Sequence, residues 1–219
     1  MNILAIDTST KDLLMAVQCE NQTTHSVSTQ SLQHSKILFT DLESLLEKAG
    51  IDKTKIDVIA VNLGPGSFTG IRIGVVFAKG MAYALGTKLV SADAFTCVAS
   101  ERKDLLPAGI ICEERNGGGY FAIAKEENGE VEISHRGVYK SEEIEKLMQK
   151  ENIQNLLCSS ENKIGAQVVS GINGLLEIAN KAIQKGDFNS IEQLEPVYIK
   201  KSQAEEQLEE KLKKISENK

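Results

Sequence analysis

The segment Asn62–Gly74, NLGPGSFTGIRIG, follows one apolar run and opens another, and it contains four glycines. Gly64-Pro65-Gly66 is typical of a tight turn, and Ser67 is placed to cap the helix that follows. We expect this helix to cover about eighteen residues, to end at Leu85 and to be closed by Gly86. The strand, turn and helix joined here decide the fold, so the glycines need a physical explanation.

Two glycine-rich nucleotide motifs do not fit the segment. A P-loop requires Gly, four residues and then Gly-Lys-Ser/Thr, and no lysine follows a glycine in that register. The dinucleotide fingerprint GxGxxG is also missing, because the spacing here is GxGxxxG with a proline between the first two glycines. A helix N-terminus preceded by glycines still favours anions, so a weak nucleotide or phosphate site stays open as an alternative.

Small residues occupy every fourth position of the predicted helix: Gly70, Gly74, Ala78 and Ala82. They form one continuous stripe, along which another backbone can approach closely. Glycine inside a helix costs about 1 kcal/mol relative to alanine, so two of them in register imply a compensating contact. The spacing leaves two interpretations open, which are close packing within the subunit and a helix contact with another chain.

The composition indicates an ordinary soluble globular protein, with 219 residues, 41% hydrophobic and 26% charged. The net charge of −6 gives no general attraction to nucleic acid, so any RNA contact needs a local basic patch or a partner. The four cysteines are too dispersed for a disulfide framework. The start, MNILAIDTST, has no basic region, and the apolar window 71–89 is interrupted by charges, so we expect no membrane span and a cytoplasmic location.

The chain predicts one α/β unit twice. The first copy is expected to have strands at 2–6, 13–17 and 24–28, a helix at 34–49, a strand at 56–63, the glycine helix and a strand at 88–91. The second is expected to have strands at 109–112, 120–125 and 130–134, a helix at 141–149, a strand at 155–159 and a helix at 168–185 broken near 171–174. The predicted domains are residues 1–102, 103–190 and 191–219. The last contains a charged helical pattern at 203–214, whose narrow apolar stripe includes Leu208 and Leu212.

Four stretches resemble the bacterial TsaB family, also called YeaZ. They are ILAIDTST at 3–10, His-Ser at 34–35, LGPGSFTGIRIGVVFAKGMAYALG at 63–86 and LEPVYIKKSQAE at 194–205. The glycine segment is specific to that family and to its paralogue TsaD, and the resemblance covers most of the first half and the last thirty residues. It implies an actin-like ATPase fold (ASKHA, RNase H-like) with two copies of a βββαβα unit, the second copy reduced.

The resemblance also implies a function. TsaB pairs with TsaD, which transfers a threonylcarbamoyl group to adenosine 37 of tRNA, and a small ATPase, TsaE, joins the complex. The chain is then a noncatalytic scaffold rather than an enzyme on its own, a heterodimer with TsaD or a homodimer in isolation, reaching tRNA only through the complex. The alternative is a self-standing phosphotransferase of the actin-like superfamily, or a peptidase.

In this family the two first-half helices pack against their counterparts in TsaD or in a second copy, as a four-helix bundle. The resemblance therefore favours the intermolecular interpretation of the small-residue stripe. The residues expected at the partner interface are His34, Leu38, Leu42, Leu45, Gly70, Gly74, Ala78 and Ala82.

No catalytic or metal-binding residue is expected. The two metal-binding histidines of TsaD fall on Ala94 and Val98, neither of which can bind a metal, and the chain's three histidines form no HxxxH pair.

The turn after the first strand supplies the candidates for a weak nucleotide or phosphate site: Asp7, Thr8, Ser9 and Thr10. Asp7 as a simple turn residue is the competing interpretation. No tightly bound cofactor is expected, and ATP or ADP at the seam with a partner is a secondary expectation. The loop Glu113–Gly119 departs from the family's usual pattern, although Arg115 stands in the matching place.

Overall fold

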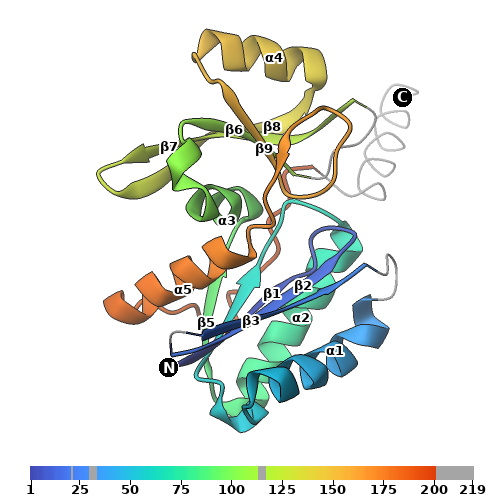
Figure 1. The fold of residues 1–219 in the computed structure, drawn as a ribbon, viewed down its shortest axis with the longest axis vertical. Helices are drawn as coiled ribbons and strands as arrows, with labels where there is room; N and C mark the ends of the chain where they lie inside the picture. The colour runs from blue at the N-terminus through green and yellow to red at the C-terminus, as the bar shows by residue number, and fades with distance from the viewer. Residues whose placement is uncertain (21, 30–33, 113–116, 201–219) are drawn as a thin grey trace, which may run out of the picture.

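The structure, a computed structural model, describes residues 1–20, 22–29, 34–112 and 117–200. It contains two five-stranded sheets, one from each half of the chain. Helices α1 and α2 cover the outer face of the first sheet, α3 and α5 lie between the two sheets, and α4 covers the outer face of the second sheet (Figure 1). The molecule is therefore layered, with the helix pair α1 and α2 at one end.

The first sheet has the strand order β3-β2-β1-β4-β5. Strand β1 pairs antiparallel with β2 and parallel with β4, and it lies at the centre of the sheet. The elements of this half are β1 (Asn2–Asp7), β2 (Leu13–Cys19), β3 (Gln22–Ser28), α1 (His34–Ala49), a 3-10 turn (Lys53–Lys55), β4 (Val58–Asn62), α2 (Phe68–Leu85), β5 (Lys88–Ala92), α3 (Ala94–Glu101) and a second 3-10 turn (Lys103–Leu105).

The second sheet repeats this order as β8-β7-β6-β9-β10. Residues 159–166 connect β9 to β10 without a helix, so the counterpart of α2 is missing from this copy. The predicted fold, two βββαβα units with the second reduced, is thus confirmed. The elements of this half are β6 (Ala108–Cys112), β7 (Gly118–Glu127), β8 (Glu130–Lys140), α4 (Ser141–Lys150), β9 (Asn155–Cys158), β10 (Gln167–Val168) and α5 (Ile172–Lys185).

Two predicted elements of the second half were wrong in extent. Strand β8 continues six residues beyond the predicted Ser134 to Lys140, because a register shift opposite Phe121 and a positive φ at His135 interrupt the alternation from which a strand is read. Helix α5 begins at Ile172 rather than at 168, because Gln167 and Val168 pair with β9 and Gly171 takes a left-handed conformation before the helix.

Helix α5 belongs to the second half in sequence but packs on the first sheet. Its buried residues, among them Leu175 and Ala179, share one hydrophobic cluster with residues of β1, β2 and β4. The helix also approaches α3 closely at Gly174, where a β-carbon would collide with the carbonyl oxygen of Cys97. The two halves are thus joined by their central helices, and the division of the chain into three domains stays a prediction.

The segment after α5 returns to the first sheet. Asn189 forms an isolated bridge with Leu89, and Leu194 is buried in the same core as α1 and α2. The amide of Val197 donates to the carbonyl oxygen of Leu63 at 2.8 Å. Residues 201–219, which include the helical pattern predicted at 203–214, lie outside the described part of the chain, as do the side chain of His34 and Arg115.

Candidate partner-binding groove

The glycine turn is fastened to the end of β1. Ser67 caps α2 as predicted, since its hydroxyl accepts from the amide of Gly70 at 3.3 Å, and its own amide donates to the carbonyl oxygen of Ser9 at 2.7 Å. A β-carbon on Gly66 would collide with that same carbonyl oxygen. Glycine is needed here because the loop lies directly on the backbone of the β1–β2 turn.

The stripe of small residues on α2 faces the inside of the protein. A β-carbon at Gly70 would collide with the carbonyl oxygen of Thr8, and one at Gly74 would collide with the Thr8 hydroxyl. That hydroxyl donates to the carbonyl oxygen of Gly70 at 2.7 Å. Ala78 and Ala82 continue the stripe into the core of the first sheet, fully buried. The close approach implied by the glycines is therefore made with this chain's own first strand and turn.

This placement corrects the residues expected at the partner interface. Gly70, Gly74, Ala78 and Ala82 are occupied by internal contacts, and Leu42 and Leu45 of α1 are buried in the same core. Leu38 is also buried, at 1% exposed, although it lines the groove described below. An amphipathic helix turns its apolar stripe toward its own sheet first, so the surface must be sought on another face.

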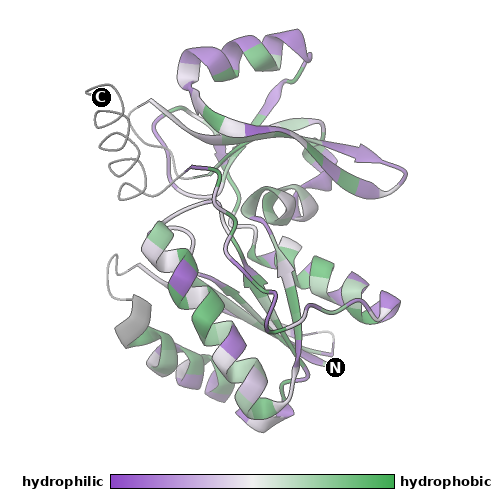
Figure 2. Cartoon of the chain, turned by 180° about the vertical axis from the view of Figure 1, so that it is seen from behind, coloured by the Kyte–Doolittle hydropathy of each residue, from purple (hydrophilic) through white to green (hydrophobic). Residues whose placement is uncertain are grey.

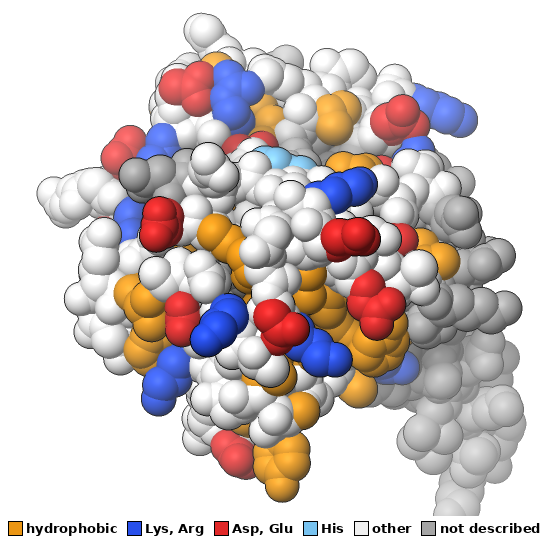
Figure 3. Space-filling view, turned by 60° about the horizontal axis from the view of Figure 1, so that its bottom comes forward, with side chains coloured by type: hydrophobic (Ala, Val, Ile, Leu, Met, Phe, Trp, Pro, Cys, Tyr) orange, Lys and Arg blue, Asp and Glu red, His pale blue; other side chains and the backbone are white. Residues whose placement is uncertain are grey.

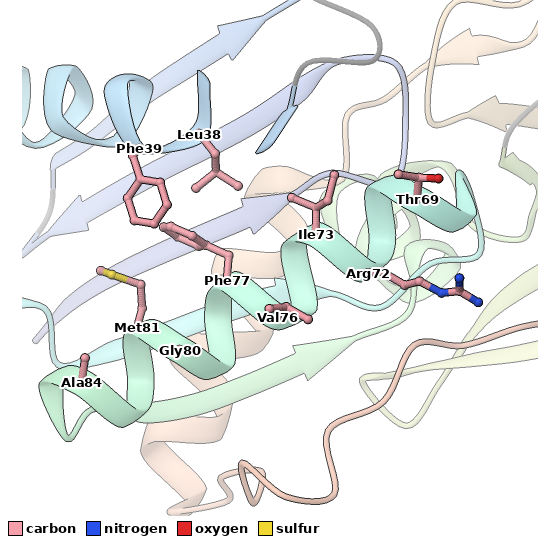
Figure 4. A pocket seen from close by; sticks show the side chains of 10 residues that line it. All are labelled: Leu38, Phe39, Thr69, Arg72, Ile73, Val76, Phe77, Gly80, Met81 and Ala84. Carbon is pink, nitrogen blue, oxygen red and sulfur yellow. The ribbon is translucent and has the colours of Figure 1, made fainter. Parts of the chain in front are cut away.

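A groove of about 690 Å³ lies between α1 and α2 on the side away from the sheet. Phe39 and Leu38 face Ile73 and Phe77 across it, and the rings of Phe39 and Phe77 meet edge to face at 5.1 Å (Figure 4). Val76 and Met81 extend the apolar lining, and Gly80 and Ala84 form the far end. Phe39 is 61% exposed and Val76 69% exposed, so apolar surface faces solvent here.

Sequence reasoning found the two helices but missed this face of α2. Ile73, Val76, Phe77, Gly80, Met81 and Ala84 follow one another at three- and four-residue intervals, beside the buried stripe. Such spacing describes a second apolar face. Figure 2 shows hydrophobic colouring over much of α2, interrupted by hydrophilic residues. The available signal was that this helix is apolar on more than one side.

The same apolarity makes α2 resemble a membrane span. It is the one helix among the described residues with the length and composition to cross a bilayer. Its small-residue face packs on the sheet, and a core helix of a globular protein can have the same length and composition as a membrane span. The cytoplasmic location stays a prediction.

The guanidinium of Arg72 is held in place at the end of the groove where α2 begins, which we call the near end. The Nε of Arg72 donates to the hydroxyl of Tyr198 at 2.9 Å, and its guanidinium lies 5.5 Å from the centre of that ring. The ring of Tyr198 is stacked on Phe68 at 5.1 Å. The aromatic pair and the hydrogen bond hold the guanidinium at the edge of the groove, with Thr69 beside it (Figure 4).

The residues proposed for a weak phosphate site do lie together. All four, Asp7 to Thr10, are at most 8% exposed. The Asp7 carboxylate accepts from the amide of Ser9 and from the side chain of Asn62, each at 2.7 Å. The side-chain oxygen Oδ1 of Asn62 in turn accepts from the amide of Gly64 at 2.8 Å. Asn62, which sequence reasoning missed, thus joins the turn to the glycine loop. A nucleotide role for these residues stays a prediction.

The described residues contain no group of three histidine, cysteine or acidic side chains that could hold a metal. Ala94 and Val98 are buried in the core of the second sheet. Burial raises the pKa of the Cys97 and Cys112 thiols well above the ordinary range, which keeps both protonated at neutral pH. These cysteines are therefore structural groups rather than activated nucleophiles.

Comparisons with known proteins agree with this architecture. The family model of TsaD, tRNA N6-adenosine threonylcarbamoyltransferase, matches residues 24–112. The tRNA threonylcarbamoyladenosine biosynthesis protein TsaB of Haemophilus influenzae is 29% identical over 105 residues, 48% of this chain and 44% of that protein. TsaB of Escherichia coli K12 is 22% identical over 230 residues, 93% of this chain and 96% of that protein. The chain is thus similar to a TsaB protein along nearly its whole length.

The fold likeness extends over nearly the whole chain. YeaZ from Pseudomonas aeruginosa superposes with a TM-score of 0.70 at 21% identity, covering 90% of this chain and 99% of that chain. The part that matches the TsaD model runs from β3 to β6 and includes both groove helices. The groove therefore lies in the region that matches the TsaD model.

Proposed function

We propose that this chain is a member of the TsaB family and acts in tRNA threonylcarbamoyladenosine biosynthesis as a noncatalytic subunit that binds TsaD through the groove between α1 and α2. One observation carries the proposal: an exposed apolar groove lies on the helix pair that the chain shares with TsaD.

The chemistry of the groove suits a protein better than a small ligand. A ligand site places a few polar groups so that they converge on the ligand, whereas the polar groups Thr69 and Arg72 stand at one end of this groove. Phe39, Val76 and Tyr83 are 61%, 69% and 82% exposed. Figure 3 shows apolar side chains exposed at the end of the molecule that carries α1 and α2, with charged side chains around them. An apolar patch with a polar rim is typical of a protein interface.

The match between this chain and the TsaD model supports TsaD as the partner. Because the TsaD model matches the segment that contains α1 and α2, TsaD is expected to carry a comparable helix pair. Two such pairs can pack around a pseudo-twofold axis, each filling the other's groove, as in an isologous dimer. The same geometry accommodates a second copy of this chain when TsaD is absent. A stable complex needs roughly 800 Å² from each partner, so the groove would be the centre of a larger contact.

Three features favour a noncatalytic role. The Asp7 carboxylate is buried and hydrogen-bonded within the chain, Ala94 and Val98 replace the histidines expected of TsaD, and the thiols of Cys97 and Cys112 are protonated. These features of the described residues favour a complex in which TsaD carries out the chemistry. TsaE and a nucleotide at the seam stay predictions.

Reconstitution with purified components tests the proposal. The chain alone is expected to form no threonylcarbamoyladenosine, and its addition to TsaD, TsaE and the enzyme that makes the adenylate is expected to restore the product. Val76→Arg should abolish binding and product, because it places a charge in the groove. The control Val138→Arg changes a valine that is 53% exposed on β8 and should leave both unchanged. Product formed equally well without the chain, or full activity of Val76→Arg, would refute the proposal.

A further inference from the structure

The near end of the groove selects a particular chemical group in the partner. We infer that the guanidinium of Arg72 binds an Asp or Glu carboxylate of TsaD, which lies beside an apolar side chain that covers Val76. The inference rests on the function proposed above, because it names the chemistry that the groove requires of its partner.

The guanidinium of Arg72 is exposed but held in one position. Its Nε donates to the hydroxyl of Tyr198 at 2.9 Å, and its Cζ lies 5.5 Å from the centre of the Tyr198 ring and 6.0 Å from that of Phe68. The two rings are stacked at 5.1 Å with 10° between their planes. An arginine normally loses side-chain entropy when it enters an interface, and these contacts reduce that loss in advance.

The segment that carries Tyr198 is itself fastened to the first half. The Nζ of Lys79 on α2 donates to the carbonyl oxygen of Leu194 at 3.1 Å, and the side chain of Leu194 is buried in the core. The amide of Val197 donates to the carbonyl oxygen of Leu63 at 2.8 Å. Tyr198 is therefore a fixed support, and the position of the guanidinium depends on it.

A carboxylate suits this guanidinium better than a neutral acceptor does. A guanidinium carries five N–H donors in a planar fork, so it can bind a carboxylate while it donates to Tyr198. Hydrogen bonds between charged groups are about twice as strong as those between neutral groups. Apart from Thr69, the residues that line the groove with Arg72 have no polar side chain, so water is excluded around such a bond when a partner covers the groove.

The order of side chains along α2 places the carboxylate. Arg72, Val76 and Gly80 follow one another at four-residue intervals, about 6 Å apart along the helix (Figure 4). Val76 is 69% exposed, and a β-carbon on Gly80 would meet no heavy atom within 4 Å. The row thus passes from a positive charge to an apolar side chain and then to open space. A purely apolar partner surface would cover the guanidinium without satisfying its charge, which costs free energy and disfavours such a partner.

Titration calorimetry of TsaD with variants of the full chain tests the inference. Arg72→Gln should bind about thirtyfold more weakly than the wild-type chain, and Arg72→Lys about tenfold, because lysine keeps the charge but not the planar fork. Tyr198→Phe keeps the stacked ring and loses the hydroxyl, so it should bind about threefold more weakly. Added salt should weaken binding of the wild-type chain more than that of Arg72→Gln. The control Arg102→Gln removes a guanidinium that pairs with Asp104 away from the groove, and it should bind as the wild-type chain does.

A charge exchange identifies the carboxylate. Arg72→Glu should give no measurable binding to wild-type TsaD, because two negative charges then meet. In a set of TsaD variants, each with one acidic residue of its helix pair replaced by arginine, one should bind Arg72→Glu and lose the wild-type chain. This rescue would also show that Arg72→Glu is folded.

The inference is overturned if Arg72→Gln binds TsaD as tightly as the wild-type chain, or if no charge exchange restores binding to Arg72→Glu. Gly80→Arg separates this failure from that of the proposed function. If Gly80→Arg does not bind while Arg72→Gln does, the groove is the TsaD site and only the role of Arg72 is refuted. If the wild-type chain does not bind TsaD, or if Gly80→Arg binds equally well, the proposed function itself is refuted.

Discussion

Two identical substitutions on α2 should have opposite effects on stability. Gly74→Ala places a methyl group against the Thr8 hydroxyl, which is buried and bonded to the Gly70 carbonyl oxygen. Gly80→Ala places the same group where no heavy atom lies within 4 Å. Both variants gain about 1 kcal/mol of helix propensity, so the difference between them reports the contact at Gly74.

The magnitudes decide the sign. Overpacking in a close-packed core costs about 2 kcal/mol, and disturbing the Thr8 hydrogen bond costs about 1 kcal/mol more. After the gain in propensity, Gly74→Ala should lose about 2 kcal/mol of unfolding free energy, whereas Gly80→Ala should gain about 1 kcal/mol. Urea unfolding followed by circular dichroism measures both values, since the change in midpoint gives the change in stability when the slope is constant.

The double variant Thr8→Ala/Gly74→Ala gives a further check. Removing the hydroxyl makes room for the new methyl group, so the two losses should not add. A Gly74→Ala protein that is as stable as Gly80→Ala would refute the internal packing of the stripe.

Three further predictions concern other parts of the fold. Asn62→Ala should cost about 3 kcal/mol in urea unfolding, because it leaves Asp7 and the amide of Gly64 buried with fewer partners. Burial raises the pKa of the Cys97 and Cys112 thiols, so they hold protons that the unfolded chain releases above about pH 8.5. The unfolding free energy should therefore fall as pH rises above that value, by about 1.4 kcal/mol per pH unit for each thiol, and Cys97→Ala should show a shallower fall. Gly174→Ala should lower the melting temperature by several degrees, because its β-carbon would meet the backbone of α3.

Local signals predicted much of the fold. The bounds of α1, the cap at Ser67 and the left-handed Gly86 after α2 are all confirmed. Asp93 caps α3 in the same local way, since its carboxylate accepts from the amide of Thr96 at 3.1 Å. Each of these helix bounds and caps depends on residues within one or two turns of the helix end. Such local features can be predicted from the sequence alone.

The orientation of α2 could not be predicted in the same way. A stripe of small residues indicates that some backbone comes close, but the backbone here belongs to Thr8, 62 residues before Gly70. Spacing along one helix does not identify the neighbour. The family resemblance then favoured another chain, and the buried face was taken for the exposed one. The position of α5 on the first sheet was missed for the same reason, since it depends on contacts between distant segments.

We propose above all that the face of α2 beside the small-residue stripe binds TsaD. Titration calorimetry of TsaD with the wild-type chain, Gly80→Ala and Gly80→Arg tests it most directly, because position 80 lines the groove without touching the core. We predict that Gly80→Ala binds TsaD as the wild-type chain does, and that Gly80→Arg gives no measurable heat although it stays folded. Equal binding by all three proteins would contradict the claim.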